Sequence, residues 1–142
     1  MIQYLLVEAG GSYYGLGAHE VLAVADGFDL YPTLSGHPAV RGVTPIRDRL
    51  VPLIDLAGLL TDGAELATKG ETIVVAQAGD TLIALQVDDA HEVVSGTLRP
   101  VPSVWRLPWA VGVDEWGEEL VPIVDIELLV ERLVPAAVRE TV

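Results

Sequence analysis

Hydrophobic residues along the chain occur in short runs, and one of these runs alternates regularly. Ile83, Leu85 and Val87 share one face of an extended segment, while the residues between them lie on the other face. Other apolar runs of strand length lie at 4–7, 72–76 and 120–124. Separating such runs are 14 glycines and 9 prolines. This pattern predicts short β-strands joined by turns.

The same hydrophobic pattern occurs twice in the chain. The segment Ala18-His19-Glu20-Val21 recurs 72 positions later as Ala90-His91-Glu92-Val93. Residues 50–56, which read LVPLIDL, recur 70 positions later as LVPIVDI at 120–126. A weaker match relates 7–11 to 75–79 at an offset of 68. Three matches in the same order at nearly one offset predict two related halves, near 1–68 and 69–142.

Each half ends in a predicted short helix that begins at an aspartate. Asp55 and Asp125 each follow an apolar run and precede leucines or isoleucines at helical spacing, so we expect both to be N-caps. Capping explains these two aspartates without catalysis, and we therefore reject an aspartic-protease pair. Two halves of strands, turns and a short helix predict two small barrels or sandwiches packed together, with exchange of chain ends between them left open.

Composition restricts the class of protein further. The chain has 142 residues and a formal net charge of −13, from 21 acidic and 8 basic residues. Nucleic-acid binding is disfavoured, because it uses Lys and Arg to neutralise phosphates. The chain has no cysteine, which excludes disulfides and thiolate metal sites. No apolar run reaches the ~18 residues that span a bilayer. We expect a single-domain cytoplasmic protein without direct membrane insertion.

Candidate catalytic chemistry is sparse. No serine lies in a Gly-x-Ser-x-Gly motif, and no glycine-rich phosphate-binding motif is present. His19 and His91 occupy equivalent positions of the two halves, and nothing in the sequence brings them together with His37 at ligand spacing. We therefore expect no enzyme activity, no metal site and no cofactor.

One basic cluster departs from the acidic composition. Arg41, Arg47 and Arg49 contribute three of the eight basic residues within nine positions. Apolar side chains alternate with them, namely Val43, Ile46 and Leu50. This is either a solvated basic turn or a partner-binding patch, since arginine is enriched at protein interfaces. The equivalent segment of the second half, 114–119, is acidic instead, so the two halves are expected to offer tips of opposite charge.

The order and spacing of these motifs resemble the CheW-like adaptor family of bacterial chemotaxis. The family pattern Gly-Val-Ile-Asn-Leu-Arg-Gly, two variable residues and Val-Pro-Val-Ile-Asp-Leu is similar to residues 42–56. Residues 87–93 are similar to the family motif Val-Asp-x-Val-x-Glu-Val, and the resemblance extends from residue 2 to about 133. Pro45 replaces the family asparagine and Asp48 replaces a glycine, so we expect an altered loop around Arg47.

The resemblance implies an all-β fold of two packed, five-stranded, SH3-like barrels with short helices, one of them near the C-terminus, in one CheW-like domain over 1–142. It implies a non-catalytic scaffold that binds the regulatory domain of a CheA-type histidine kinase and the cytoplasmic tip of chemoreceptors. Arg47 matches the family arginine associated with this coupling. Two alternatives are a self-associating structural or pilus-motility scaffold, and a small-ligand module or enzyme that uses the cleft between the barrels.

Overall fold

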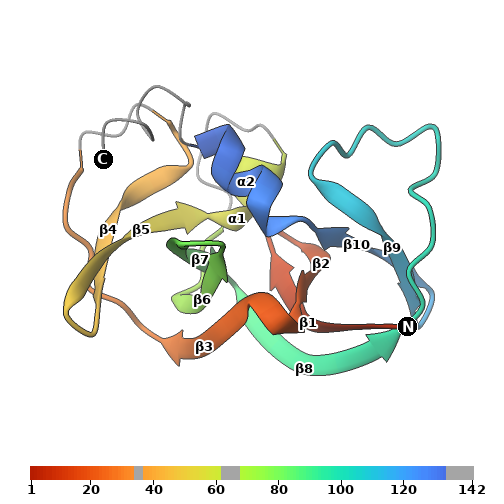
Figure 1. Cartoon of the computed structure of the whole chain (residues 1–142), viewed down its shortest axis with the longest axis horizontal. Helices are drawn as coiled ribbons and strands as arrows, with labels where there is room; N and C mark the ends of the chain where they lie inside the picture. Colours follow the sequence, from red (N-terminus) through yellow and green to blue (C-terminus); the bar gives the residue numbers. More distant parts are fainter. Residues whose placement is uncertain (34–36, 62–67, 134–142) are drawn as a thin grey trace.

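The computed structural model describes residues 1–33, 37–61 and 68–133, and its strands form two five-stranded sheets (Figure 1). One sheet has the strand order β8-β1-β2-β10-β9, and we call it the β1 barrel. The other has the order β3-β6-β7-β5-β4, and we call it the β6 barrel. The elements are β1 (Ile2–Ala9), β2 (Ser12–Gly17), the 3-10 helix η1 (Ala18–Glu20), β3 (Val21–Asp26), β4 (Val40–Ile46), β5 (Arg49–Asp55), α1 (Leu56–Leu60), β6 (Thr72–Ala78), β7 (Thr81–Val87), β8 (Asp89–Gly96), β9 (Ala110–Trp116), β10 (Glu119–Val124) and α2 (Ile126–Leu133). The predicted all-β class is confirmed.

The sequence repeat is also a repeat of strand topology. Exchanging β1–β5 with β6–β10 converts the strand order of one sheet into that of the other. Each half contains two antiparallel hairpins with two-residue turns, β1–β2 and β4–β5 in the first and β6–β7 and β9–β10 in the second. Each strand of one barrel therefore has an equivalent strand about 70 residues away in the other, which allows the two barrels to be compared strand by strand.

Each sheet combines strands from both halves of the sequence. In the β1 barrel, β1 and β2 lie beside β8, β9 and β10, and in the β6 barrel, β6 and β7 lie beside β3, β4 and β5. Parallel pairs join the hairpins, with Leu53 opposite Ala84 in one sheet and Ile123 opposite Gly15 in the other. Neither 1–68 nor 69–142 thus forms a sheet on its own. Residues 62–67 and 134–142 of these predicted halves lie outside the described residues.

Isolated bridges connect the two edges of each sheet. The chain that leaves β3 pairs with the opposite edge strand, because Tyr31 and Val43 exchange two backbone hydrogen bonds of 2.8 Å. Arg99 and Val113 make the equivalent bridge between the chain after β8 and β9, again with two bonds of 2.8 Å. These bridges curl each five-stranded sheet toward a closed barrel, which covers edge strands that would otherwise be free to pair with other chains.

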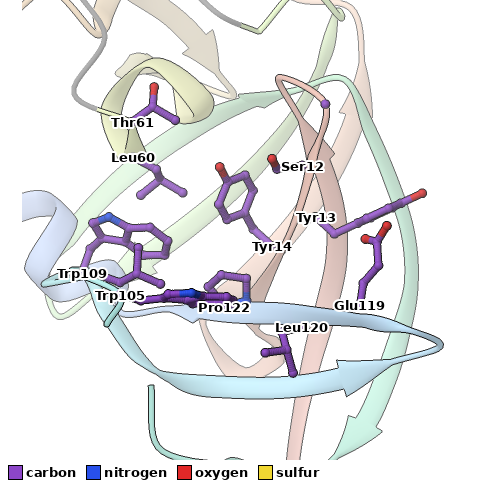
Figure 2. A pocket seen from close by; sticks show the side chains of 12 residues that line it. Ser12, Tyr13, Tyr14, Leu60, Thr61, Trp105, Trp109, Glu119, Leu120 and Pro122 are labelled. Carbon is purple, nitrogen blue, oxygen red and sulfur yellow. The ribbon is translucent and has the colours of Figure 1, made fainter. Parts of the chain in front are cut away.

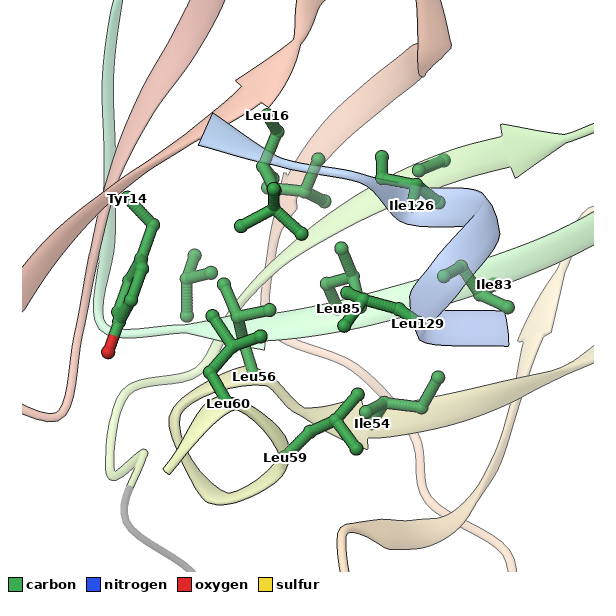
Figure 3. Packing of buried hydrophobic residues seen from close by; sticks show 14 of the residues in the cluster. Tyr14, Leu16, Ile54, Leu56, Leu59, Leu60, Ile83, Leu85, Ile126 and Leu129 are labelled. Carbon is green, nitrogen blue, oxygen red and sulfur yellow. The ribbon is translucent and has the colours of Figure 1, made fainter. Parts of the chain in front are cut away.

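The hydrophobic core consists of three clusters, and the largest of them joins the two barrels. One small cluster lies inside the β6 barrel and includes Leu53 and Ile73, and another lies inside the β1 barrel and includes Leu6 and Ile123. The largest cluster lies between the sheets and receives side chains from both barrels and both helices (Figure 3). Its labelled members in the figure are Tyr14, Leu16, Ile54, Leu56, Leu59, Leu60, Ile83, Leu85, Ile126 and Leu129. The alternating segment 82–87 serves two clusters at once, because Ile83 and Leu85 face the shared cluster while Ala84 faces the barrel interior.

Both helices begin at an aspartate whose carboxylate accepts a hydrogen bond from a backbone N–H in the first turn. Oδ1 of Asp55 accepts from Gly58 at 3.0 Å, and Oδ1 of Asp125 accepts from Leu128 at 3.2 Å. The backbone N–H of each aspartate is also bonded in the same way, to Ala39 in one half and to Trp109 in the other. Each aspartate therefore ends a strand and caps the helix that follows, which is a structural role.

Candidate partner-binding site

The hairpin of β4 and β5 carries the predicted partner-binding residues at one end of the molecule (Figure 1). Ile46 pairs with Arg49, so that Arg47 and Asp48 form the turn. Arg47 has a φ of 57°, and it is the one non-glycine residue with positive φ in the part of the chain that the structure describes. The left-handed conformation therefore falls on Arg47 and not on Asp48, where the family has its glycine.

The backbone at Arg47 favours a residue without a side chain. In the equivalent turn between β9 and β10, the first position is Gly117 with a φ of 62°. A hairpin turn of this kind prefers glycine there, because Cβ clashes with the backbone at positive φ and costs about 1–2 kcal/mol. Arginine keeps this position at an energetic cost. Strain of this kind is concentrated at functional sites, where the side chain has a task that offsets the cost.

Half of the predicted patch is exposed at the hairpin tip. Arg47 and Arg49 are exposed, and the side chain of Leu50 is 65% accessible. Pro45 is exposed as well, at the end of the edge strand β4, where a missing N–H is tolerated. The tip thus presents two guanidinium groups beside exposed apolar surface, a combination typical of protein interfaces.

The other three residues of the predicted patch are half-buried. Nη1 of Arg41 donates to Oε1 of the buried Gln86 at 2.9 Å, and its guanidinium lies 5.8 Å from the ring centroid of Phe28. Ile46 packs on the cluster inside the β6 barrel, and Val43 holds the closing bridge described above. The structure therefore brings together Arg47, Arg49 and Leu50 as the exposed set. Alternation along β4 was a signal that Ile46 lies on the opposite face from Val43.

The equivalent hairpin tip of β9 and β10 is acidic. Glu115, Glu118 and Glu119 are exposed, and Nη1 of Arg99 lies 3.1 Å from Oε1 of Glu115. Asp114, which belongs to the same acidic run in the sequence, is instead 5% accessible. The surface charge of this tip therefore comes from its three glutamates.

Asp114 forms a buried polar pair that the sequence pattern did not reveal. Its Oδ2 accepts a hydrogen bond of 2.8 Å from the hydroxyl of Tyr4, which has no accessible surface, and its Oδ1 accepts from the N–H of Thr97 at 3.2 Å. Burial, and next the hydrogen bond to Asp114, raise the pKa of Tyr4 well above its ordinary value. Gly96 leaves room for this carboxylate, because a Cβ there would overlap it.

Asp88 was also missed, although it stands in the second motif that resembled the family. Its carboxylate accepts three backbone hydrogen bonds, from Gly10 at 2.7 Å, Lys69 at 3.0 Å and Gly70 at 2.7 Å. These donors belong to the β1–β2 turn and to the chain that enters β6. Asp88 therefore ties the β1–β2 turn to the chain that enters β6, which is a role in the fold.

The family model for the CheW-like domain matches residues 3–134, which is nearly the whole chain. This chain belongs to the CheW-like family. A curated relative, the chemotaxis protein CheW of Klebsiella aerogenes, is 26% identical over 134 residues, which are 89% of this chain and 80% of the relative. The resemblance inferred from the sequence is thereby confirmed, and the protein is a CheW-like scaffold of the chemotaxis type.

A solved structure has the same fold as this CheW-like protein. The scaffolding protein TtCheW from Thermoanaerobacter tengcongensis matches with a TM-score of 0.79 at 19% identity, over 90% of this chain and 86% of that one. The two-barrel architecture predicted from the resemblance is confirmed by this match. Among the described residues, no helix is long and apolar enough to cross a bilayer.

Proposed function

We propose that this CheW-like protein is a non-catalytic, cytoplasmic adaptor that couples chemoreceptors to a CheA-type histidine kinase, and that the tip formed by Arg47, Arg49 and Leu50 is one of its partner contacts. The observation that carries the proposal is the left-handed backbone of an exposed arginine at the family's coupling position. A turn selected only for stability favours glycine there, as the equivalent Gly117 illustrates.

The chemistry of the tip suits a partner with an acidic and apolar surface. A guanidinium group makes paired hydrogen bonds to a carboxylate, while Leu50 offers apolar area beside it. The hairpin grows from two paired strands of a barrel, so that the side chains are presented on a rigid support. An adaptor needs such surfaces and no reacting groups.

Binding of purified partners tests the proposal. Titration calorimetry with the regulatory domain of a CheA-type kinase, and separately with a receptor cytoplasmic tip, is expected to give saturable binding. Arg47→Glu should weaken binding to at least one partner by roughly tenfold or more, as for an interface arginine. The charge reversal Lys69→Glu is the matched control, because Lys69 is exposed and lies outside the β4–β5 hairpin, in the segment that leads into β6. Equal binding by both variants, or no binding to either partner, would contradict the proposal.

Self-association is a second candidate function, which the opposite charges of the two tips favour. Arg49 and Glu119 occupy equivalent positions in the two hairpins, and next to them Leu50 and Leu120 are 65% and 39% accessible. A basic tip of one copy is complementary to an acidic tip of the next, and such heterologous contacts build rings or filaments.

Sedimentation velocity over a range of concentrations tests self-association. Larger species should appear at low ionic strength and decrease as salt screens the charges. Arg49→Glu should abolish them, and the double swap of Arg49→Glu with Glu119→Arg should restore them, because complementarity returns with reversed sign. A monomer at every concentration and ionic strength would refute this candidate.

A further inference from the structure

The β1 barrel has a groove lined by aromatic residues. The groove has a volume of about 680 Å³ and runs between β2, β10, the end of α1 and the segment that precedes β9 (Figure 2). Strands β2 and β10 are paired in register only at Ile123–Gly15 and Val124–Leu16 in the described residues, and Pro122 has no N–H to extend this ladder. The groove opens where these two strands are no longer paired.

The internal repeat shows that the aromatic lining is not a requirement of the fold. Tyr13 and Tyr14 follow the β1–β2 turn at positions where β7 has Leu82 and Ile83. Trp109 accepts the backbone hydrogen bond of Asp125, as Ala39 does for Asp55 in the other half. Aliphatic residues thus satisfy the same architecture in the β6 barrel. Tyr14 and Trp109 pack in the core between the barrels, and Tyr13 packs against Trp116 and His91. Trp105, which is 38% accessible, is the aromatic lining residue that leaves most of its ring open to a ligand.

The lining combines flat apolar surfaces with hydrogen-bond donors. Tyr14 and Trp109 make an edge-to-face contact with centroids 5.8 Å apart, and Trp105 remains 38% accessible. Phenol and indole groups offer O–H and N–H donors at the edge of an apolar ring. The phenol of Tyr14 is protonated at neutral pH like any tyrosine, and burial raises its pKa further. Such a surface fits a ligand with apolar rings and exposed carbonyl acceptors.

One end of the groove is apolar and the other end carries a negative charge. Figure 2 shows Trp109 and Leu60 at one end and Glu119 at the other. Among the described lining residues, Glu119 is the one side chain that is charged at neutral pH. A ligand with an apolar part followed by a basic group matches this arrangement.

We propose that this groove binds a segment of a partner protein in the polyproline II conformation, with prolines against Trp105 and Tyr14 and a lysine or arginine at Glu119. Polyproline II segments have fully solvated backbone carbonyls and little conformational entropy to lose, and aromatic grooves are a common way to recognise them. The site lies on the β1 barrel, whereas the Arg47 hairpin belongs to the β6 barrel, and it goes beyond the adaptor proposal.

A peptide titration of the whole 142-residue chain tests the proposal. The probes are two fluorescent peptides of eight prolines, one ending in arginine and the other in glutamate. We expect the arginine peptide to bind at least fivefold more tightly and to shift the indole N–H resonances of Trp105 and Trp109. Trp105→Ala should weaken binding at least tenfold, while Trp105→Phe, which keeps an aromatic face, should retain most of it. No kinase or receptor is present, so the result is separate from that of the adaptor proposal.

Matched glutamate variants define the basic end of the ligand. Glu119→Gln should remove the preference for the arginine peptide, whereas Glu118→Gln, an exposed neighbour outside the groove, should leave it unchanged. The proposal is overturned by equal affinity of wild type and Trp105→Ala, by equal effects of the two glutamate variants, or by no binding at millimolar peptide. A Trp105-dependent dimer without peptide would assign the groove to a second copy and would overturn it as well.

Discussion

Replacing Arg47 by glycine should make the protein more stable, although it removes a side chain. Arg47 is exposed and has a φ of 57°, so the substitution forfeits little packing and removes the clash of Cβ with the backbone. The strain released is about 1–2 kcal/mol. The extra freedom of glycine in the unfolded chain takes back about 0.4–1 kcal/mol. We expect a net gain of about 1 kcal/mol, or a Tm rise of about 3 °C for a domain of this size.

Urea unfolding followed by circular dichroism measures this gain, and the next turn residue supplies the control. Asp48 does not have positive φ, so Asp48→Gly releases no strain and should lower the free energy of unfolding by a few tenths to 1 kcal/mol. If Arg47→Gly is no more stable than wild type, the left-handed turn is not strained, and the structural argument for Arg47 fails. The same variant should bind its partners more weakly, so that stability and binding change in opposite directions.

Three further predictions concern polar groups with several partners or with a buried one. Asp88 is half-buried, so Asp88→Ala removes the acceptor of three backbone N–H groups that water can partly reach, and it should cost about 1–2 kcal/mol in urea unfolding, whereas the exposed Asp89→Ala should be nearly neutral. Tyr4→Phe removes the donor to buried Asp114 and should cost about 1–3 kcal/mol at neutral pH. Because the pKa of Tyr4 in the folded protein is raised above its ordinary value of about 10, the contribution of Tyr4 to stability is complete below about pH 10 and is lost as the pH rises through the folded pKa. Tyr4→Phe should therefore flatten the alkaline loss of stability measured by thermal melts. Gly96→Ala places a methyl group against the Asp114 carboxylate and should lower stability by about 1–3 kcal/mol, while the neighbouring Ser95→Ala should not; an equal effect of the two would contradict the close approach.

Local signals in the chain were sufficient for the strands and the helix starts. Residues 82–87 alternate because a strand places successive side chains on opposite faces, and both faces of β7 are covered by apolar clusters. Asp55 and Asp125 act within one turn of their own position, so their capping role is legible from the adjacent residues. The candidate site was only partly predictable from the sequence. The arginines of the cluster look alike there, because what separates the exposed from the half-buried ones is their surroundings in the fold.

Contacts between distant residues decided the rest. Arg41 faces Gln86, which is 45 positions away, and Asp114 faces Tyr4, which is 110 positions away. No local pattern distinguishes these two from the exposed Arg47 and Glu118. The left-handed backbone at Arg47 likewise follows from the register of β4 on β5, because Ile46 and Arg49 must pair and two residues must close the turn.

By itself, the sequence determined the family, the all-β class, the internal repeat and the two helix caps, because each depends on residue types at short range or on matches between the halves. Only the tertiary structure decided that each barrel takes strands from both halves, which arginines are exposed, and where an aromatic groove opens. The physical reason is that strand pairing and burial depend on which segments meet in space. The hairpins of the two halves are similar in sequence, so local signals do not distinguish pairing within a half from the pairing across halves that the sheets show.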